Sequence, residues 1–233
     1  GLNGAIRVYL FEGKTGKFDF DESGIPSQNN ARLGSYQSPF YVVHFGLIYS
    51  KSCHLYGSES LFHWKKDETL QAWRGSPPDP TIERFKATAD WLLNHATINS
   101  DGVAHFIYDF DWPYKGYPGG KLSSGWWSGL TDGYAIILLL RAYDCFGDEK
   151  YLDLATALYQ GLYASVRQGG SKIIWNGRPW IEEYVDPNVV EPTQMSRVFN
   201  GMAYSYFGVK AYESFFGYGS FADTLFNSMQ INI

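Results

Sequence analysis

The chain has 233 residues, of which 45% are hydrophobic, 18% aromatic and 18% charged. This composition excludes intrinsic disorder, which requires low hydrophobicity and high charge. The 19 Lys and Arg against 24 Asp and Glu give a net charge of −5, and the basic residues are scattered, so we expect no nucleic-acid partner. The longest apolar run, residues 135–140, is too short for a membrane-spanning helix, so we expect no membrane span.

The N-terminal part of the chain has the pattern of a β-hairpin. Residues 5–20 alternate weakly between apolar and polar side chains and turn at residues 13–16. A polar loop is expected to follow over residues 21–35. We therefore predict a hairpin-and-loop part at residues 1–35 and a helical, catalytic-type domain at residues 36–233.

Six helical segments are predicted in that domain, and they alternate between two kinds. Three are apolar on nearly all sides: residues 39–54, 126–145 and 196–216. Three carry one apolar stripe: residues 80–96, 149–166 and 221–229, the first with Asp79 and Pro80 as its expected N-cap and N1 residues. A helix that is apolar all round must be buried all round. The alternation predicts helical hairpins with inner and outer helices, which is a mainly α fold of the α/α-toroid type with an incomplete ring.

Two irregular segments join consecutive hairpins and are expected on one rim of the scaffold. Residues 104–122 mix a short strand with Pro and Gly turns. Residues 172–184 contain Asn176 and Gly177 between two strand-like stretches, which is typical of a short β-hairpin. Because loops on one rim of a rigid scaffold often carry function, both segments are candidates for a site.

The densest group of candidate catalytic side chains follows Trp180. Glu182, Glu183 and Tyr184 place two carboxylates and a phenol within three residues, a set that could transfer protons to and from a sugar. The alternative is a solvated strand edge with one aromatic anchor, because glutamates are usually exposed.

A second group lies in residues 108–114, where acidic and aromatic side chains alternate. In a strand, Asp109 and Asp111 share one face and the rings of Tyr108 and Phe110 the other. The aromatic face is either a platform for a sugar or a buried face of the strand.

Several polar or aromatic residues lie at helices that are predicted to be buried. Trp126 opens an inner helix, where its ring either stacks on a sugar or packs in the core. Asp132, Arg141 and Asn200 are polar and need hydrogen-bond partners if they are buried. They either pair within the core or line a central cavity.

No motif predicts a cofactor or a metal. The histidines lack metal-ligand spacing, and the Gly-x-Ser-x-Gly and dinucleotide-binding fingerprints are missing from the sequence. We therefore expect no cofactor and no metal site.

Two blocks of residues carry a resemblance to a known family. The first block is Gly24-Ile25-Pro26, Tyr36, Pro39, Phe45-Gly46-Leu47 and Tyr49-Ser50-Lys51. The second is Gly125-Trp126-Trp127-Ser128, Gly133, Ala135-Ile136, Arg141-Ala142-Tyr143, Trp180, Glu182-Glu183-Tyr184, Asn200-Gly201-Met202 and Tyr204-Ser205. Together they resemble the glucuronyl C5-epimerase family, whose members convert D-glucuronate to L-iduronate within heparan-type polysaccharides. The family's C-terminal domain is an α/α helical assembly, which agrees with the predicted alternation.

The resemblance implies that Glu183 and Tyr184 are catalytic and that the partner is a uronate-containing polysaccharide. It also implies a secreted protein or one in the lumen of the secretory pathway, while a bacterial origin and a homo-oligomer both stay open. As substrate-binding residues we predict Glu182, Arg178, Trp126, Tyr108, Asp109 and Asn200.

Epimerisation at C5 of a uronate removes a proton next to a carboxylate and returns it from the opposite face, which requires a proton acceptor and a proton donor. Glu183 suits the acceptor if it is desolvated. Tyr184 needs a neighbouring cation to act as a base, and Arg178 or Arg197 is a candidate. Because neighbouring residues of an ideal strand point to opposite faces, both side chains can reach one substrate only if the strand bulges or ends there.

Three other functions stay open on the sequence alone. A polysaccharide lyase on a related α/α scaffold would begin with the same proton abstraction. A glycoside hydrolase would need two carboxylates, such as Glu183 and Asp109. A non-catalytic carbohydrate-binding protein would use the aromatic residues without the chemistry.

Overall fold

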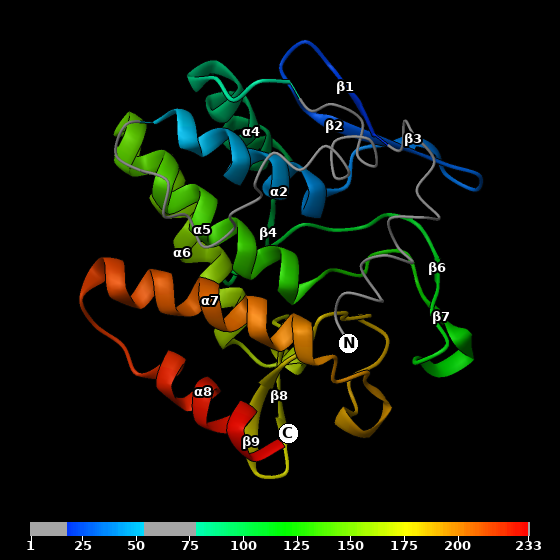
Figure 1. Ribbon diagram of the computed structural model, residues 1–233. Helices are drawn as coiled ribbons and strands as arrows, with labels where there is room; N and C mark the ends of the chain where they lie inside the picture. The colour runs from blue at the N-terminus through cyan, green and yellow to red at the C-terminus, as the bar shows by residue number, and fades with distance from the viewer. Residues whose placement is uncertain (1–17, 54–77, 233) are drawn as a thin grey trace. The chain divides into compact units, whose positions relative to one another are not determined.

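The computed structural model describes residues 18–53 and 78–232. The chain divides into two compact units, Gly1–Trp91 and Leu92–Ile233. Within the described residues, helices dominate and are joined by short strands and 3-10 turns, which confirms the predicted mainly α class (Figure 1). None of the described helices combines the length and apolar character needed to cross a bilayer. The predicted domain boundary after residue 35 stays a prediction.

Three short strands form an antiparallel sheet in the first unit. They are β1 (Phe18–Phe20), β2 (Pro26–Asn30) and β3 (Gly34–Tyr36). The Tyr36 hydroxyl donates to the side chain of its cross-strand partner Gln28 at 3.0 Å. The prediction of a polar loop over residues 21–35 is therefore wrong, because β2 and most of β3 lie in this range. Polar cross-strand contacts hold these strands, and a hydrophobic pattern does not reveal such contacts. The hairpin predicted over residues 5–20, with its turn, lies largely outside the described residues.

Helix α2 (Pro39–Tyr49) packs against this sheet within the first unit and continues into the 3-10 turn η1 (Ser50–Ser52). The ring of Phe45 is fully buried and meets the rings of Phe18 and Phe20 edge-on, at centroid distances of 5.5 and 4.9 Å. The predicted apolar helix at this position is therefore confirmed.

Helix α4 (Ile82–His95) begins later than its sequence suggested. The Thr81 hydroxyl accepts the Arg84 backbone N–H at 3.2 Å and so caps the first turn. The prediction of Asp79 as the N-cap is wrong, because residues 78–81 are not helical. Thr81 directly precedes the helix, and from this position a side-chain oxygen reaches the N–H of the third helical residue.

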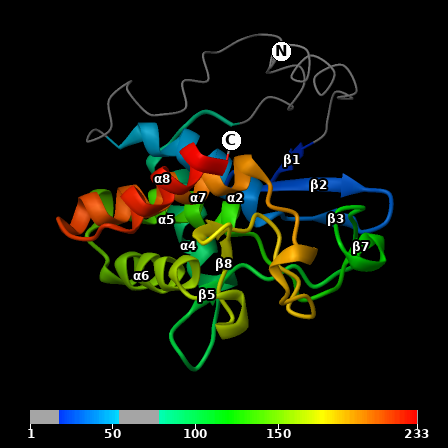
Figure 2. The same ribbon diagram turned by 90° about the horizontal axis from the view of Figure 1, so that it is seen from below.

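The second unit contains four helices: α5 (Gly129–Phe146), α6 (Glu149–Tyr163), α7 (Phe199–Phe216) and α8 (Phe221–Asn232). Figures 1 and 2 show α7 beside α5, with α6 packed on α5 and α8 on α7. Helix α5 is buried on nearly all sides, whereas α6 buries one stripe that includes Leu154, Leu158 and Leu162. The predicted pairing of an apolar helix with a one-sided helix is confirmed for these elements.

Helix α7 differs from the prediction for a helix that is buried all round. Phe199, Phe207 and Phe215 are 46%, 38% and 37% exposed. The neighbours α5 and α8 cover only part of its circumference, so one apolar side stays open in the described part of this unit.

Small residues allow α5 and α7 to approach closely. A Cβ atom at Gly208 would lie 2.1 Å from the Gly133 carbonyl oxygen, and one at Gly133 would lie 2.6 Å from the Ser205 Cα. Neither position accepts a side chain without moving a helix backbone.

Short strands and 3-10 turns connect the helices of the second unit. The strand pairs are β4 (Thr97–Ile98) with β5 (Ala104–His105), β6 (Trp112–Pro113) with β7 (Lys121–Leu122), and β8 (Lys172–Trp175) with β9 (Arg178–Ile181). The 3-10 turns are η2 (Pro118–Gly120), η3 (Val166–Gln168) and η4 (Pro192–Gln194). Asn176 and Gly177 have positive φ angles of 50° and 74°, which confirms the predicted two-residue hairpin between β8 and β9.

The two irregular segments of the second unit contact each other, because the Tyr117 hydroxyl donates to the Tyr184 carbonyl. Their position on one rim of the scaffold stays a prediction. The backbone of Trp127 pairs with that of Val185, with Trp127 N–H to Val185 O at 3.1 Å. The Asp186 carboxylate accepts the Ser123 N–H at 2.7 Å. These contacts bring the segment after β9 against the segment that leads into α5.

The Gly208→Ala substitution tests the close approach of α5 and α7. The added methyl group would collide with the Gly133 backbone, and overpacking of this kind costs about 1–3 kcal/mol of unfolding free energy. We expect a lower midpoint of urea unfolding than in the wild type and in Asp153→Ala, which alters only an exposed position of α6. A midpoint at or above that of the wild type would contradict the close approach, because alanine is otherwise the better helix former.

Candidate active site

The candidate site lies where the chain leaves strand β9. The strand ends at Ile181, and the next residue, Glu182, donates its backbone N–H to the Ser171 carbonyl at 2.9 Å. Glu183 and Tyr184 then form a bend before the backbone pairs again at Val185. The strand therefore ends before the predicted catalytic pair, which is the condition under which both side chains can reach one substrate.

The side chains of Glu183 and Tyr184 converge. The Tyr184 hydroxyl donates a hydrogen bond to the Glu183 carboxylate, which also accepts the backbone N–H of Gly201 at the start of α7. A Cβ atom at Gly201 would lie 2.2 Å from the Glu183 Cβ, so the missing side chain of this glycine makes room for the glutamate. Glu183 is 6% exposed, and its Oε2 atom has no hydrogen-bond partner among the described residues.

Burial sets the protonation of this pair. Burial raises the pKa of Glu183, against the smaller opposing effects of the Tyr184 and Gly201 hydrogen bonds. Burial and the negative charge of Glu183 raise the pKa of Tyr184, and the nearby Tyr114 and Tyr108 add to this. A carboxylate of raised pKa is a better proton acceptor, and a phenol of raised pKa keeps its proton. A phenol that keeps its proton suits a proton donor better than a base, and the role of Tyr184 stays a prediction.

Glu182 is fully buried beside the pair. Its Oε2 atom accepts the Arg197 backbone N–H at 3.0 Å and the Ser196 hydroxyl at 3.3 Å, so it fixes the segment that leads into α7. Its Oε1 atom has no partner among the described residues. Burial raises the pKa of Glu182 to about 7, although the hydrogen bonds and charge of Arg197 and Ser196 oppose the shift.

An aromatic cluster surrounds the Tyr184 ring. The rings of Tyr108 and Trp126 stack at 3.9 Å with 5° between their planes, and the Trp126 ring N–H donates to the Phe110 carbonyl at 3.0 Å. The Tyr117 hydroxyl donates to the Tyr184 carbonyl, and the Tyr114 and Tyr184 rings lie 4.9 Å apart. Tyr108 and Trp126 are thus buried and cover each other, which favours a supporting wall over an open platform for a sugar.

The remaining predicted substrate-binding residues are exposed. Asp109 lies opposite the buried Tyr108, as the alternation predicted. Asn200 was expected in a buried helix but is exposed, because α7 begins only at Phe199 and its first turn is open. Its neighbour Gly201 touches Glu183, so Asn200 lies at the site, whereas Arg178 lies beside the turn at the other end of β9.

Neither arginine that was expected to activate Tyr184 contacts its hydroxyl. Arg178 is exposed at the hairpin turn. The Arg197 guanidinium lies 4.0 Å from the centroid of the Trp175 ring and donates to the Pro192 carbonyl at 2.6 Å. Arg197 is therefore occupied by other contacts, and Arg178 lies at the hairpin turn. With neither cation at its hydroxyl, Tyr184 keeps a raised pKa.

A buried pair that the sequence reasoning missed lies behind the site. His105 Nδ1 is 2.7 Å from Asp132 Oδ2, and His105 Nε2 is 2.7 Å from the Gly169 carbonyl. The His105 ring stacks on Trp127 at 4.6 Å, and the Trp127 ring N–H donates to the Ser171 hydroxyl at 3.0 Å. The signal in the sequence was Asp132, a carboxylate in an apolar helix that needed a partner.

Within the described ranges, 18–53 and 78–232, no three His, Cys, Asp or Glu side chains gather in a metal-binding arrangement.

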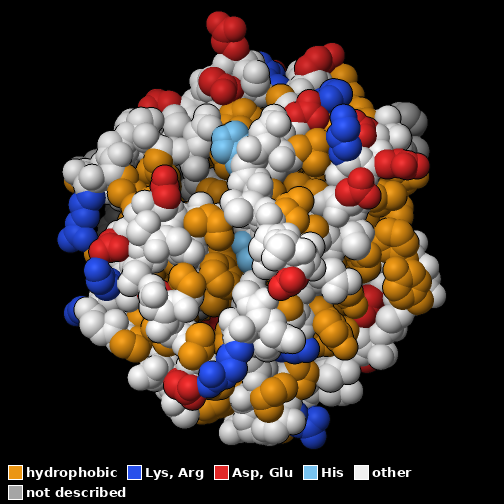
Figure 3. Space-filling model, turned by 180° about the vertical axis from the view of Figure 1, so that it is seen from behind, with side chains coloured by type: hydrophobic (Ala, Val, Ile, Leu, Met, Phe, Trp, Pro, Cys, Tyr) orange, Lys and Arg blue, Asp and Glu red, His pale blue; other side chains and the backbone are white. Residues whose placement is uncertain are grey.

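On the face drawn in Figure 3, Lys and Arg side chains are dispersed among Asp and Glu and do not form one basic surface. The absence of a nucleic-acid partner stays a prediction.

Comparison with known proteins identifies the family. The family described as "D-glucuronyl C5-epimerase C-terminus" matches residues 101–230, which is more than half of the chain and includes the whole candidate site. The chain therefore belongs to the C-terminal family of the D-glucuronyl C5-epimerases, and the resemblance noted in the sequence is confirmed.

Two individual proteins show the extent of the similarity. A D-glucuronyl C5-epimerase of Caenorhabditis elegans is 35% identical over 88 residues, which are 38% of this chain and 13% of the worm protein. The matched stretch is thus a small part of that relative. The structure of a cellobiose 2-epimerase from Spirochaeta thermophila aligns with 92% of this chain and 46% of its own, with 15% identity and a TM-score of 0.39.

The raised pKa of Glu182 predicts how stability depends on pH. Between about pH 4.3, where a glutamate of the unfolded chain titrates, and about pH 7, the folded protein holds a proton that the unfolded chain has lost. The free energy of unfolding therefore falls as pH rises through this range, by at most about 1.4 kcal/mol per pH unit from this group. Above about pH 7 the contribution of Glu182 no longer changes with pH.

Urea unfolding of Glu182→Gln from about pH 5 to about pH 8 checks this dependence. We expect stability to fall less steeply with pH in the variant than in the wild type, and the raised pKa of Glu183 keeps part of the slope. Glu191→Gln, at an exposed position of the same connecting segment, should keep the wild-type slope. Parallel profiles for the wild type and Glu182→Gln would show that Glu182 is ionised throughout.

Proposed function

We propose that the chain is the catalytic part of a polysaccharide uronate C5-epimerase that acts on D-glucuronate residues. The observation that carries the proposal is the Glu183 carboxylate, which is buried, hydrogen-bonded to Tyr184 and left with one oxygen unpartnered among the described residues. The family membership supports the same reaction.

In the proposed reaction, the C5–H bond breaks and the proton passes to the free oxygen of Glu183. The electron pair enters the bond between C5 and the uronate carboxyl carbon, and the charge moves onto the carboxylate oxygens. Burial favours the proton transfer, because it makes the neutral form of Glu183 the more stable one.

Tyr184 is proposed as the proton donor. Its phenol keeps its proton in this environment, and its transfer to C5 from the other side of the ring gives the L-iduronate configuration without net oxidation or reduction. In the free protein the Tyr184 hydroxyl donates to Glu183. We infer that the substrate replaces this hydrogen bond when it takes its place between the two groups.

The Glu183→Gln substitution tests the proposed acceptor. Incubation of an unsulfated glucuronate-containing polysaccharide in heavy water, read by NMR, should show deuterium at C5 with the wild type. The variant should lose this exchange by about 10²–10⁴-fold, because an amide does not accept the proton.

The matched control is Glu191→Gln, which removes an exposed carboxylate and should retain the exchange. Circular dichroism checks that both variants are folded. Unchanged exchange in Glu183→Gln would remove Glu183 from the mechanism, and an unsaturated product that absorbs in the near ultraviolet would instead identify a lyase.

The Tyr184→Phe substitution separates the donor from the acceptor. If Glu183 abstracts the proton and Tyr184 returns one from the opposite face, the variant should still exchange C5 hydrogen with solvent but form L-iduronate about 10²-fold more slowly or worse. Both rates come from the same NMR spectra. An equal fall in the two rates would show that Tyr184 is needed for proton abstraction itself.

A further inference from the structure

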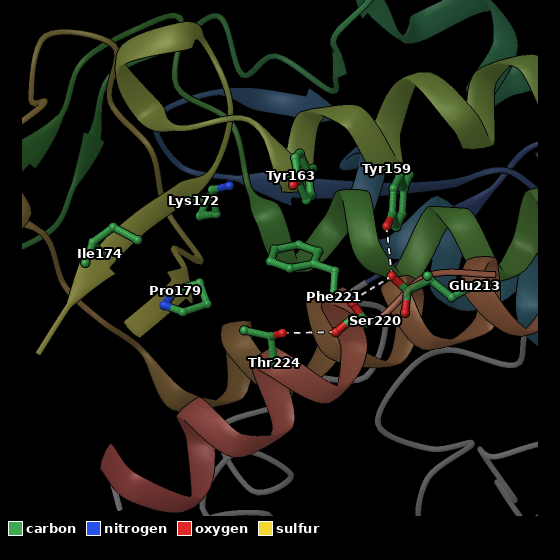
Figure 4. Close-up of a pocket in the computed structure, with 10 residues that line it drawn as sticks. Tyr159, Tyr163, Lys172, Ile174, Pro179, Glu213, Ser220, Phe221 and Thr224 are labelled. Atoms are coloured by element: carbon green, nitrogen blue, oxygen red, sulfur yellow. Dashed lines mark hydrogen bonds between the residues drawn. The ribbon is translucent and has the colours of Figure 1, made fainter. Parts of the chain in front are cut away.

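A hollow of about 460 Å³ lies on the second unit, and the catalytic candidates Glu182, Glu183 and Tyr184 do not line it. Its walls come from the last turn of α6, the first turn of α8 and the β8–β9 hairpin (Figure 4). It is a separate concave site that the proposed reaction does not use.

The hollow contains a cation without a carboxylate partner. Lys172, from β8, is half-buried, and burial lowers its pKa. Its Nζ atom lies 4.2 Å from the centroid of the Tyr163 ring and 5.5 Å from that of Phe221. Among the described residues, no Asp or Glu oxygen forms an ion pair with it.

The acidic residue in the lining is occupied elsewhere. Glu213 Oε1 accepts the Tyr159 hydroxyl and the Phe221 N–H, both at 2.9 Å, and its Oε2 accepts the Ala222 N–H at 3.0 Å. The Glu213 side chain thus holds the first turn of α8, and Figure 4 shows its bonds to Tyr159 and Phe221. Lys172 is therefore left without a carboxylate counter-charge among the described residues.

The other walls suit a sugar. The Tyr163 ring is 49% exposed, so part of its surface is free to pack against the C–H groups of a ring. Ser220 and Thr224 add hydroxyl groups at the edge, and the Thr224 hydroxyl donates to the Ser220 carbonyl at 3.0 Å. Apolar walls with a few polar groups that fix orientation are typical of sites for small ligands.

We propose that this hollow binds an acidic sugar residue, with the uronate carboxylate on the Lys172 ammonium and a face of the sugar ring against Tyr163. The inference rests on the proposed function for the identity of the polymer. Strand β9 links the two sites, because Pro179 lines the hollow and Glu183 lies just past the end of the same strand. A second uronate of the bound polysaccharide would thereby hold the polymer on the protein.

The test uses the full chain with the Glu183→Gln substitution, so that the ligand is not converted. The probe is an unsulfated hexasaccharide of glucuronate and N-acetylglucosamine, followed by calorimetry and by the backbone NMR signals of Ser220 and Phe221. Lys172→Met keeps most of the apolar stem and removes the charge, and it should weaken binding about ten- to a hundredfold. Lys172→Arg should restore it to within about threefold of the parent.

Lys210→Met is the matched control. Lys210 is exposed and also lies near an aromatic ring, 5.7 Å from the centroid of Tyr206, but it does not line the hollow. Its substitution should leave the affinity unchanged. The proposal is overturned if Lys172→Met binds like the parent, if the Ser220 and Phe221 signals do not move, or if an uncharged N-acetylglucosamine hexasaccharide or a sulfated one without uronate binds as tightly.

Deuterium exchange at C5 of the same hexasaccharide, measured with the wild type at saturating concentration, reports on the Glu183 site. If C5 does not exchange but binding depends on Lys172, the proposed reaction is wrong and the hollow remains a binding site. If C5 exchanges but binding does not depend on Lys172, only the proposal for the hollow is wrong.

Discussion

The site depends on a buried carboxylate at the start of a helix. Glu183 is removed from water and is held by the Gly201 N–H at the first turn of α7, where the helix dipole favours a negative charge. This arrangement sets two requirements. The chain must leave strand β9 at Ile181, and residue 201 must lack a side chain. The hydrogen bonds hold the carboxylate in place, whereas burial raises its pKa and so favours its accepting a proton.

Around that carboxylate, contacts of three kinds keep the segment after β9 in place. Glu182 binds the backbone before α7, Asp186 binds the backbone before α5, and the aromatic cluster packs against Tyr184. Close approach of α5 and α7 through small residues then fixes the helices that carry these partners. A group that must meet a substrate atom benefits from such support, because small displacements reduce catalysis strongly.

Periodicity was enough to predict the helices, the inner and outer pairing of α5 with α6, and the turn at Asn176 and Gly177. A resemblance suggested Glu183 and Tyr184 as the catalytic pair. It did not give their geometry, because their convergence depends on where β9 ends and on a contact with α7. The His105–Asp132 contact joins residues 27 positions apart, and local patterns do not report such distances. Strand β2 was missed because polar cross-strand contacts hold it.

The contacts of His105 have a consequence for the charge behind the site. Both ring nitrogens face an acceptor, Asp132 on one side and the Gly169 carbonyl on the other, so both hydrogen bonds form only if the imidazole and the carboxyl group share two protons. Whether the ring or the acid holds the second proton, the pair is electrically neutral. The buried pair beside Trp127 therefore adds no net charge next to the proposed site.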